Sequence, residues 1–74
     1  MPKLPVLKPR EVVSILTHLS FAEVRQRGSH KQSRHSDARV TTVPFHAGRD
    51  ISPNLLRKII EDIRLTPEEF LKLF

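Results

Sequence analysis

The sequence predicts an α+β domain with a helix, a three-stranded antiparallel sheet, a second helix and a short C-terminal helix. Three features lead to this prediction: an apolar stripe at helical spacing near the N-terminus, three β-prone runs separated by short turns, and a second helical stripe after them. With 74 residues, we expect one domain over residues 1–74, because so short a chain cannot form two hydrophobic cores. The helices should cover one face of the sheet and leave the other open to solvent.

The first helix is predicted over Pro9–Leu19. Proline suits the first turn of a helix, where its missing N–H is not needed. The apolar residues of this segment recur at i, i+4 and i+7, which predicts a buried stripe of Val12, Leu16 and Leu19.

Three strands follow, predicted at Phe21–Arg27, Ser29–Ser36 and Arg39–Phe45. Gly28 allows a positive φ angle in the first turn. The second turn, at Asp37-Ala38, has no glycine, so we expect type I geometry and not a turn that needs positive φ angles. The second strand has no apolar residue, so it should add little to the core and keep its side chains free for binding.

The C-terminal third predicts two helices. Ser52-Pro53 has the chemistry of an N-cap followed by a first-turn proline, and Asn54 is the alternative cap. The buried stripe of this helix should consist of Leu56, Ile59, Ile60 and Ile63. Thr66-Pro67-Glu68-Glu69 is a capping box that opens the last short helix. The residues available for packing there are Phe70, Leu71 and Phe74.

Positive charge is concentrated in the first two thirds of the chain. The net charge is +5, from 13 basic and 8 acidic residues. Residues 1–49 hold nine Lys or Arg against three acids, which gives +6, and residues 50–74 hold four against five, which gives −1. This asymmetry favours a polyanionic partner for the N-terminal part over a scatter of solubilising charges.

The most basic stretch is 25–35, which contains four Lys or Arg, two histidines and no acidic residue. Strand alternation predicts one row of Glu23, Arg25 and Arg27, and a second row of His30, Gln32 and Arg34. The residues that we expect to contact RNA are Arg25, Arg27, Ser29, Lys31, Arg34 and His46. Ser29 is not expected to act as a nucleophile, because no acid lies nearby in the sequence to orient a histidine base.

Histidine chemistry in this stretch is compatible with RNA cleavage. A metal-independent ribonuclease needs a base for the 2'-hydroxyl proton and a cation for the charge that develops on phosphorus. Our hypothesis is that His30 is the base and that Arg27, Lys31 or Arg34 holds the phosphate.

The proton donor is left open between His46, His35 and no protein group at all. His35 fits better as a solvent-facing strand residue, and His46 as either a structural cap or an RNA contact.

Other classes of function are disfavoured. The chain has no cysteine, and its histidines lack the clustered acids of a metal site, so we expect no disulfide, metal or cofactor. Neither a membrane-spanning run nor a signal peptide is recognisable, which favours a cytoplasmic protein. Small chains without disulfides or bound metal ions often gain stability from a partner.

The chain resembles the HicA toxins, small RNA-cleaving partners of HicB antitoxins. The segments that carry the resemblance are Leu19-Ser-Phe21, Val24-Arg-Gln-Arg-Gly-Ser-His30, Arg34-His35, Val43-Pro-Phe-His46, Asp50-Ile51 and Leu56-Arg-Lys-Ile59. The resemblance implies a fold like that of double-stranded-RNA-binding domains, cleavage of messenger RNA, and neutralisation by a tightly bound antitoxin, through which oligomers could form. It also implies that His30, after Gly-Ser, is the essential histidine.

Two functions are therefore weighed. The first is an endoribonuclease toxin of a type II toxin–antitoxin system. The alternative is a non-catalytic module, like a double-stranded-RNA-binding domain, that holds RNA and cuts nothing. Both predict salt-sensitive RNA affinity, so only the products of an RNA incubation separate them.

Overall fold

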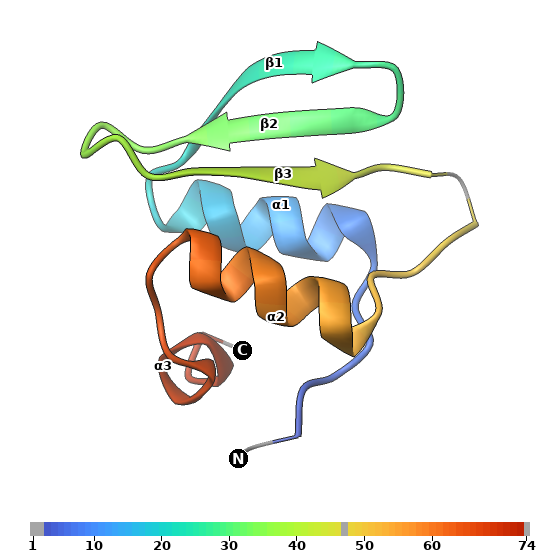
Figure 1. Ribbon diagram of the computed structural model, residues 1–74, viewed down its shortest axis with the longest axis vertical. Coiled ribbons are helices and arrows are strands. Elements are labelled where there is room, and N and C mark those ends of the chain that lie inside the picture. The colour runs from blue at the N-terminus through green and yellow to red at the C-terminus, as the bar shows by residue number, and fades with distance from the viewer. Residues whose placement is uncertain (1–2, 47, 74) are drawn as a thin grey trace.

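The computed structural model describes residues 3–46 and 48–73 and confirms the predicted order of elements (Figure 1). The elements are α1 (Pro9–His18), β1 (Ala22–Arg27), β2 (His30–Arg34), β3 (Val40–Pro44), α2 (Pro53–Asp62) and α3 (Pro67–Leu71). Each strand is slightly shorter than predicted, and α1 stops one residue earlier. Among the described residues, no helix has the length and apolar character needed to span a bilayer.

The three strands form an antiparallel sheet in the order β1-β2-β3. The polar strand β2 is therefore central, yet none of its residues belongs to the hydrophobic core, as expected. Its Ser33 is only 3% exposed and lies opposite Thr41 of β3. The Thr41 hydroxyl donates to Asp62 Oδ2 of α2 at 3.0 Å, so the polar part of this interface is hydrogen-bonded.

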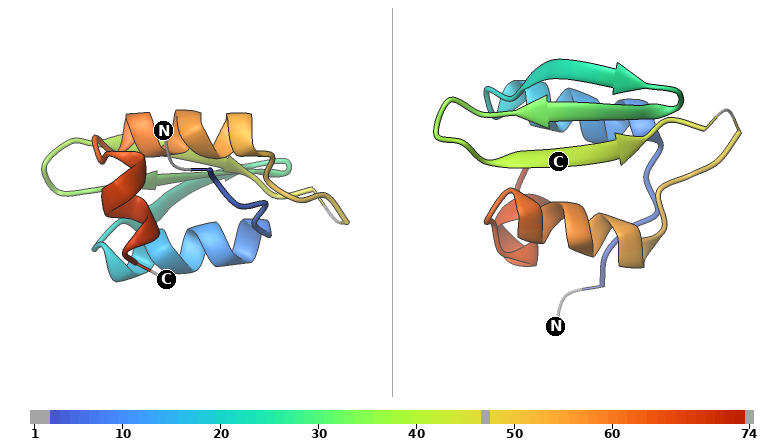
Figure 2. Two further views of the ribbon diagram at one scale, coloured as in Figure 1. Left: turned by 90° about the horizontal axis from the view of Figure 1, so that it is seen from below. Right: turned by 45° about the horizontal axis from the view of Figure 1, so that its top comes forward.

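Both long helices cover the same face of the sheet, as predicted. The right-hand view of Figure 2 looks onto the open face, with α1 behind the strands. Val12 and Leu16 of α1 are buried, whereas Leu19 is only half-buried. The predicted stripe on the second helix is buried throughout, at Leu56, Ile59, Ile60 and Ile63.

The predicted helix caps are present. Ser52 caps α2, because its hydroxyl accepts from the Leu55 N–H at 3.2 Å, and the alternative cap at Asn54 is not used. At α3, the Glu69 N–H donates to Thr66 Oγ1 at 3.1 Å and the Thr66 N–H donates to Glu69 Oε1 at 2.8 Å. The hydrogen bond from the Thr66 N–H favours the ionised carboxylate and lowers the pKa of Glu69.

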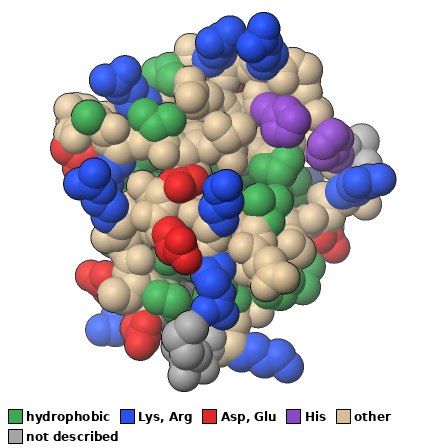
Figure 3. Space-filling model, viewed as in Figure 1, with side chains coloured by type: hydrophobic (Ala, Val, Ile, Leu, Met, Phe, Trp, Pro, Cys, Tyr) green, Lys and Arg blue, Asp and Glu red, His purple; other side chains and the backbone are tan. Residues whose placement is uncertain are grey.

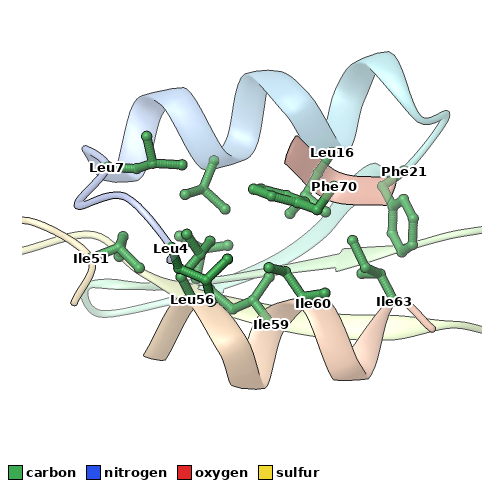
Figure 4. Close-up of a cluster of buried hydrophobic side chains, with 12 residues drawn as sticks. Leu4, Leu7, Leu16, Phe21, Ile51, Leu56, Ile59, Ile60, Ile63 and Phe70 are labelled. Atoms are coloured by element: carbon green, nitrogen blue, oxygen red, sulfur yellow. The ribbon is translucent and has the colours of Figure 1, made fainter. Parts of the chain in front are cut away.

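The short helix α3 closes the core through Phe70, which is fully buried. Figure 4 shows its ring between α1 and α2, near Leu16 and Ile60. Leu71 is half-buried, and Phe74 lies outside the described residues. The predicted packing role therefore holds for Phe70 and in part for Leu71.

The turn between β2 and β3 differs from the prediction. The Ala38 N–H donates to the His35 carbonyl at 3.0 Å, which fits a type I turn, but Ala38 itself has φ +79°. The His35 N–H then donates to the Arg39 carbonyl at 2.9 Å. A type I turn followed by a left-handed residue is a common three-residue hairpin, and it requires the positive φ that we did not expect.

Arg39 ties this turn to the end of α2. Its Nε donates to both Asp37 oxygens, at 3.0 and 2.8 Å, and Nη1 donates to the Ile63 carbonyl at 2.6 Å. The hydrogen bond from Arg39 lowers the pKa of Asp37. These contacts fix the turn that contains Ala38 against the end of α2.

Replacement of Ala38 by glycine should stabilise the protein. An L-residue in the left-handed region costs roughly 1–2 kcal/mol, and glycine avoids this but loses more entropy on folding. We expect a net gain of about 0.5–1 kcal/mol in the free energy of unfolding, measured by urea denaturation. Ala22→Gly in the exposed strand β1 is the matched control and should be destabilising; equal effects of the two changes would contradict the prediction.

Candidate nucleic-acid interface

The turn between β1 and β2 positions His30. Gly28 has φ +58°, a conformation that costs glycine little, and with Ser29 it forms the two-residue connection between the strands. Arg27 and His30 are consequently directly paired across the two strands. The His30 side chain is exposed on the open face of the sheet.

A shallow groove of about 200 Å³ lies on this face beside His30. It is lined by Arg25, Arg27, His30, Gln32 and Thr42. The strand register explains this set, because Arg25 pairs with Gln32, and Gln32 pairs with Thr42. Of the predicted site residues, the structure thus brings together Arg25, Arg27 and His30. The pattern analysis missed Thr42, although alternation along β3 places it on the same face.

Glu23 does not share the row of Arg25 and Arg27, contrary to the prediction. The register shifts between Glu23 and Arg25, so the two residues are not on the same face of β1. Glu23 pairs with the buried Ser33, and its Oε1 lies 3.7 Å from Lys31 Nζ. The irregularity therefore keeps a carboxylate away from the groove.

The side chains of Lys31 and Arg34 do not line the groove beside His30. Lys31 Nζ lies 4.2 Å from the centre of the Phe45 ring and forms an ion pair with Glu23, and strand alternation directs it away from the groove. Arg34 is on the same face as His30 but about 13 Å further along the strand, at 3.3 Å per residue, and does not line the groove.

His46 is brought next to His30, although the two residues are far apart in the sequence. The Phe45 N–H donates to the Ser29 carbonyl, which fixes the chain after β3 against the β1–β2 turn. The rings of His30 and His46 meet edge to face with centroids 5.8 Å apart. His46 Nε2 lies 3.4 Å from Ser29 Oγ, so the serine is a polar neighbour of this ring.

His35 is separate from this pair and is not a solvent-facing strand residue. It follows the end of β2, its side chain is 19% exposed, and its ring packs edge-on against Phe21 at 5.2 Å. Its Nδ1 accepts from the Asp37 N–H at 3.1 Å. Five residues of strand place it about 16 Å from His30.

The surroundings of His30 are positively charged. Within the described ranges, Arg25 and Arg27 form no ion pair, whereas Lys31 and Arg39 are each paired with a carboxylate. Figure 3 shows two histidine side chains side by side with Lys and Arg side chains around them. Uncompensated cations on an open face attract a polyanion.

A wider hollow, of about 360 Å³, also borders His30 and lies along the β3 edge. Lys58 of α2 lines it and supplies a cation that the pattern analysis missed. In residues 3–46 and 48–73 no group of three or more His, Cys, Asp or Glu side chains could hold a metal ion.

Comparison with protein families gives a match over residues 9–65 to the HicA toxin family of bacterial toxin–antitoxin systems. The matched span contains every residue of the groove and both histidines at its end. No curated protein matches the chain.

The pairing of the two imidazole rings can be tested directly by nuclear magnetic resonance. We expect nuclear Overhauser effects between the ring protons of His30 and His46, because the ring centroids are 5.8 Å apart. The His35 ring is the internal control and should show contacts to the Phe21 ring instead. A His30 ring with contacts to neither His46 nor Ser29 would contradict the described site.

Proposed function

The chain belongs to the HicA toxin family, and we propose that it is the toxin of a type II toxin–antitoxin system and cleaves messenger RNA without a metal ion. The observation that carries the proposal is the exposed His30 ring, which lines one groove with Arg25 and Arg27 and also contacts the His46 ring. This arrangement supplies a base, cations and a candidate acid on one open surface.

In the proposed reaction His30 accepts the proton of a ribose 2'-hydroxyl. The 2'-oxygen then attacks the adjacent phosphorus, and the bond from phosphorus to the 5'-oxygen breaks. The products are a 2',3'-cyclic phosphate and a 5'-hydroxyl. Imidazole is suited to this step because an ordinary histidine is largely neutral near pH 7.

Arg25 and Arg27 are proposed to hold the scissile phosphate. Their guanidinium groups line the same groove as His30, and they have no acidic partner in the described ranges. A guanidinium presents several N–H donors in one plane and can bind two phosphate oxygens together. Such donors are most effective where negative charge develops on the oxygens of the phosphorane.

His46 is the favoured proton donor to the departing 5'-oxygen. Its ring meets that of His30 at 5.8 Å, whereas His35 packs against Phe21 at the other end of the sheet. Ser29 Oγ, 3.4 Å from His46 Nε2, can help to orient the ring. The acid must carry a proton while the base must not, so the two histidines would act in opposite protonation states.

A HicB-type antitoxin is the proposed partner, because the family functions in toxin–antitoxin pairs. We propose that it covers the His30 face, where occlusion of the groove is enough to block RNA. The unpaired Arg25 and Arg27 would attract an acidic surface to this face. Oligomers would then form through the antitoxin.

The alternative is a module that binds RNA without cutting it. In that case the same open basic face would hold the RNA, and the histidines would serve only as contacts. Product chemistry decides between the two. Labelled RNA incubated with the protein and EDTA should yield fragments with a cyclic phosphate and a 5'-hydroxyl if the chain is a nuclease. Intact RNA in a stable complex at high protein excess would favour the binding module.

Replacement of His30 by alanine should remove RNA cleavage and leave the fold intact. The expected loss of rate is about 10²–10⁴-fold, which is the usual contribution of a positioned base. The His30 side chain is exposed, so the urea midpoint should stay the same. His18→Ala, at an exposed histidine in the last turn of α1, is the control and should cut RNA normally. The base assignment fails if His30→Ala cleaves at the wild-type rate.

Replacement of His46 by glutamine should lower the cleavage rate. Loss of the acid should cost about 10²-fold or more, measured as the rate at which labelled RNA is cut. His35→Gln is the matched control and should keep the wild-type rate. A His46→Gln variant that cleaves at the wild-type rate would assign the acid to another group.

A further inference from the structure

A second cavity opens next to His46, outside the groove described above. Its volume is about 490 Å³, which is in the range of small-molecule sites. It is lined by Lys8, Pro9, Arg10, Phe45, His46, Gly48, Arg49 and Asp50. The residues come from the start of α1 and from the segment between β3 and α2, which are far apart in the sequence.

Backbone hydrogen bonds hold the two walls of this cavity together. Leu7 and Ile51 form an antiparallel bridge, in which each N–H donates to the carbonyl of the other residue. The bridge places Lys8 and the start of α1 beside Asp50. On the other side, the Arg49 N–H donates to the His46 carbonyl at 3.1 Å and closes a turn. The backbone of both walls is therefore held in place by the fold.

The cavity is cationic. Of the described residues that line it, Lys8, Arg10 and Arg49 carry positive charge, and Asp50 is the one acid. The three cationic side chains are exposed, and in the described ranges none of them forms an ion pair. Phe45 and His46 add aromatic surface to the same wall. Cations beside aromatic rings are the usual means by which proteins hold single-stranded nucleic acid.

The two depressions meet at the histidine pair. His30 lines the groove, His46 lines the second cavity, and their rings are in edge-to-face contact at 5.8 Å. A strand whose scissile phosphate lies at His30 can thus continue past His46 into the second cavity. Base-paired RNA does not fit this description, because a stacked base would not leave its helix to enter a cavity.

We propose that the Lys8–Arg49 cavity binds the nucleotide next to the cleavage position of a single RNA strand, an inference that rests on the proposed ribonuclease function. Lys8, Arg10 and Arg49 hold its phosphate, and Phe45 and His46 face its base. Asp50 can accept a hydrogen bond from a ribose hydroxyl or a base amino group, which would orient the nucleotide.

The test measures the affinity of single-stranded oligoribonucleotides for the His30→Ala variant, in which the RNA stays intact. Fluorescence anisotropy is recorded for labelled oligonucleotides that lengthen by one nucleotide at a time, over a series of salt concentrations. We expect a step in affinity when the strand becomes long enough to reach the cavity. Adding Arg49→Gln or Lys8→Gln should remove the step, weaken binding about tenfold and lower the salt slope by roughly 0.7.

Two variants remove the same charge elsewhere and serve as matched controls. Arg64→Gln lies beyond the C-terminal end of α2, and Lys72→Gln lies at the end of α3. Both should keep the affinity step. Unfolding in urea should confirm that all variants fold, which is expected because the side chains of Arg49 and Lys8 are exposed. Arg49→Gln and Lys8→Gln variants that bind no more weakly than the controls would overturn the inference.

The outcomes of these experiments distinguish a failure of the cavity assignment from a failure of the proposed nuclease function. If the wild-type chain fails to cut RNA but Arg49 still governs the affinity step, the cavity binds RNA and the nuclease proposal is wrong. If the wild-type chain cuts RNA and the step is insensitive to Arg49 and Lys8, the nuclease proposal stands and the cavity assignment is wrong. An abasic residue at the added position should reduce the step, because the aromatic wall then has no base to contact.

Discussion

The structure depends on the burial of a single face of the sheet. Val43 and Thr41 of β3 are almost fully buried beneath the helices, whereas Arg25 and Arg27 of β1 are exposed. A chain of 74 residues has too few apolar side chains to cover both faces, so the second face must remain hydrated. Polar and charged side chains can therefore be placed there without loss to the core, and this is where His30 and its neighbours lie.

Periodic patterns predicted the elements because burial itself is periodic. The stripe from Leu56 to Ile63 repeats with the turn of a helix, and the caps at Ser52 and Thr66 satisfy N–H groups that every helix leaves unpaired. The alternation of His30 and Gln32 correctly placed both on one face. It failed for Glu23, because a local register shift moves the residue to the other face and leaves no sign in an alternating sequence.

Long-range contacts explain what remained unpredicted. His46 is 17 residues from Ser29, and its place beside His30 depends on a hydrogen bond from the Phe45 N–H to the Ser29 carbonyl. The sequence left the acid open between His46, His35 and no protein group, and the different neighbours of the two rings separate the histidines. Ala38 shows a related limit, since its positive φ belongs to the three-residue hairpin that joins β2 to β3 and is not a preference of alanine itself.

The position of β1 at the edge of the sheet affects self-association of the protein at high concentration. All six of its residues are exposed and one long side of it is unpaired, which is the usual template for sheet extension into aggregates. Two copies that joined there would bring Arg25 and Arg27 of each chain close together, and the register shift near Val24 would disturb their alignment. The arginines that suit an anionic ligand thus also oppose self-association into fibres.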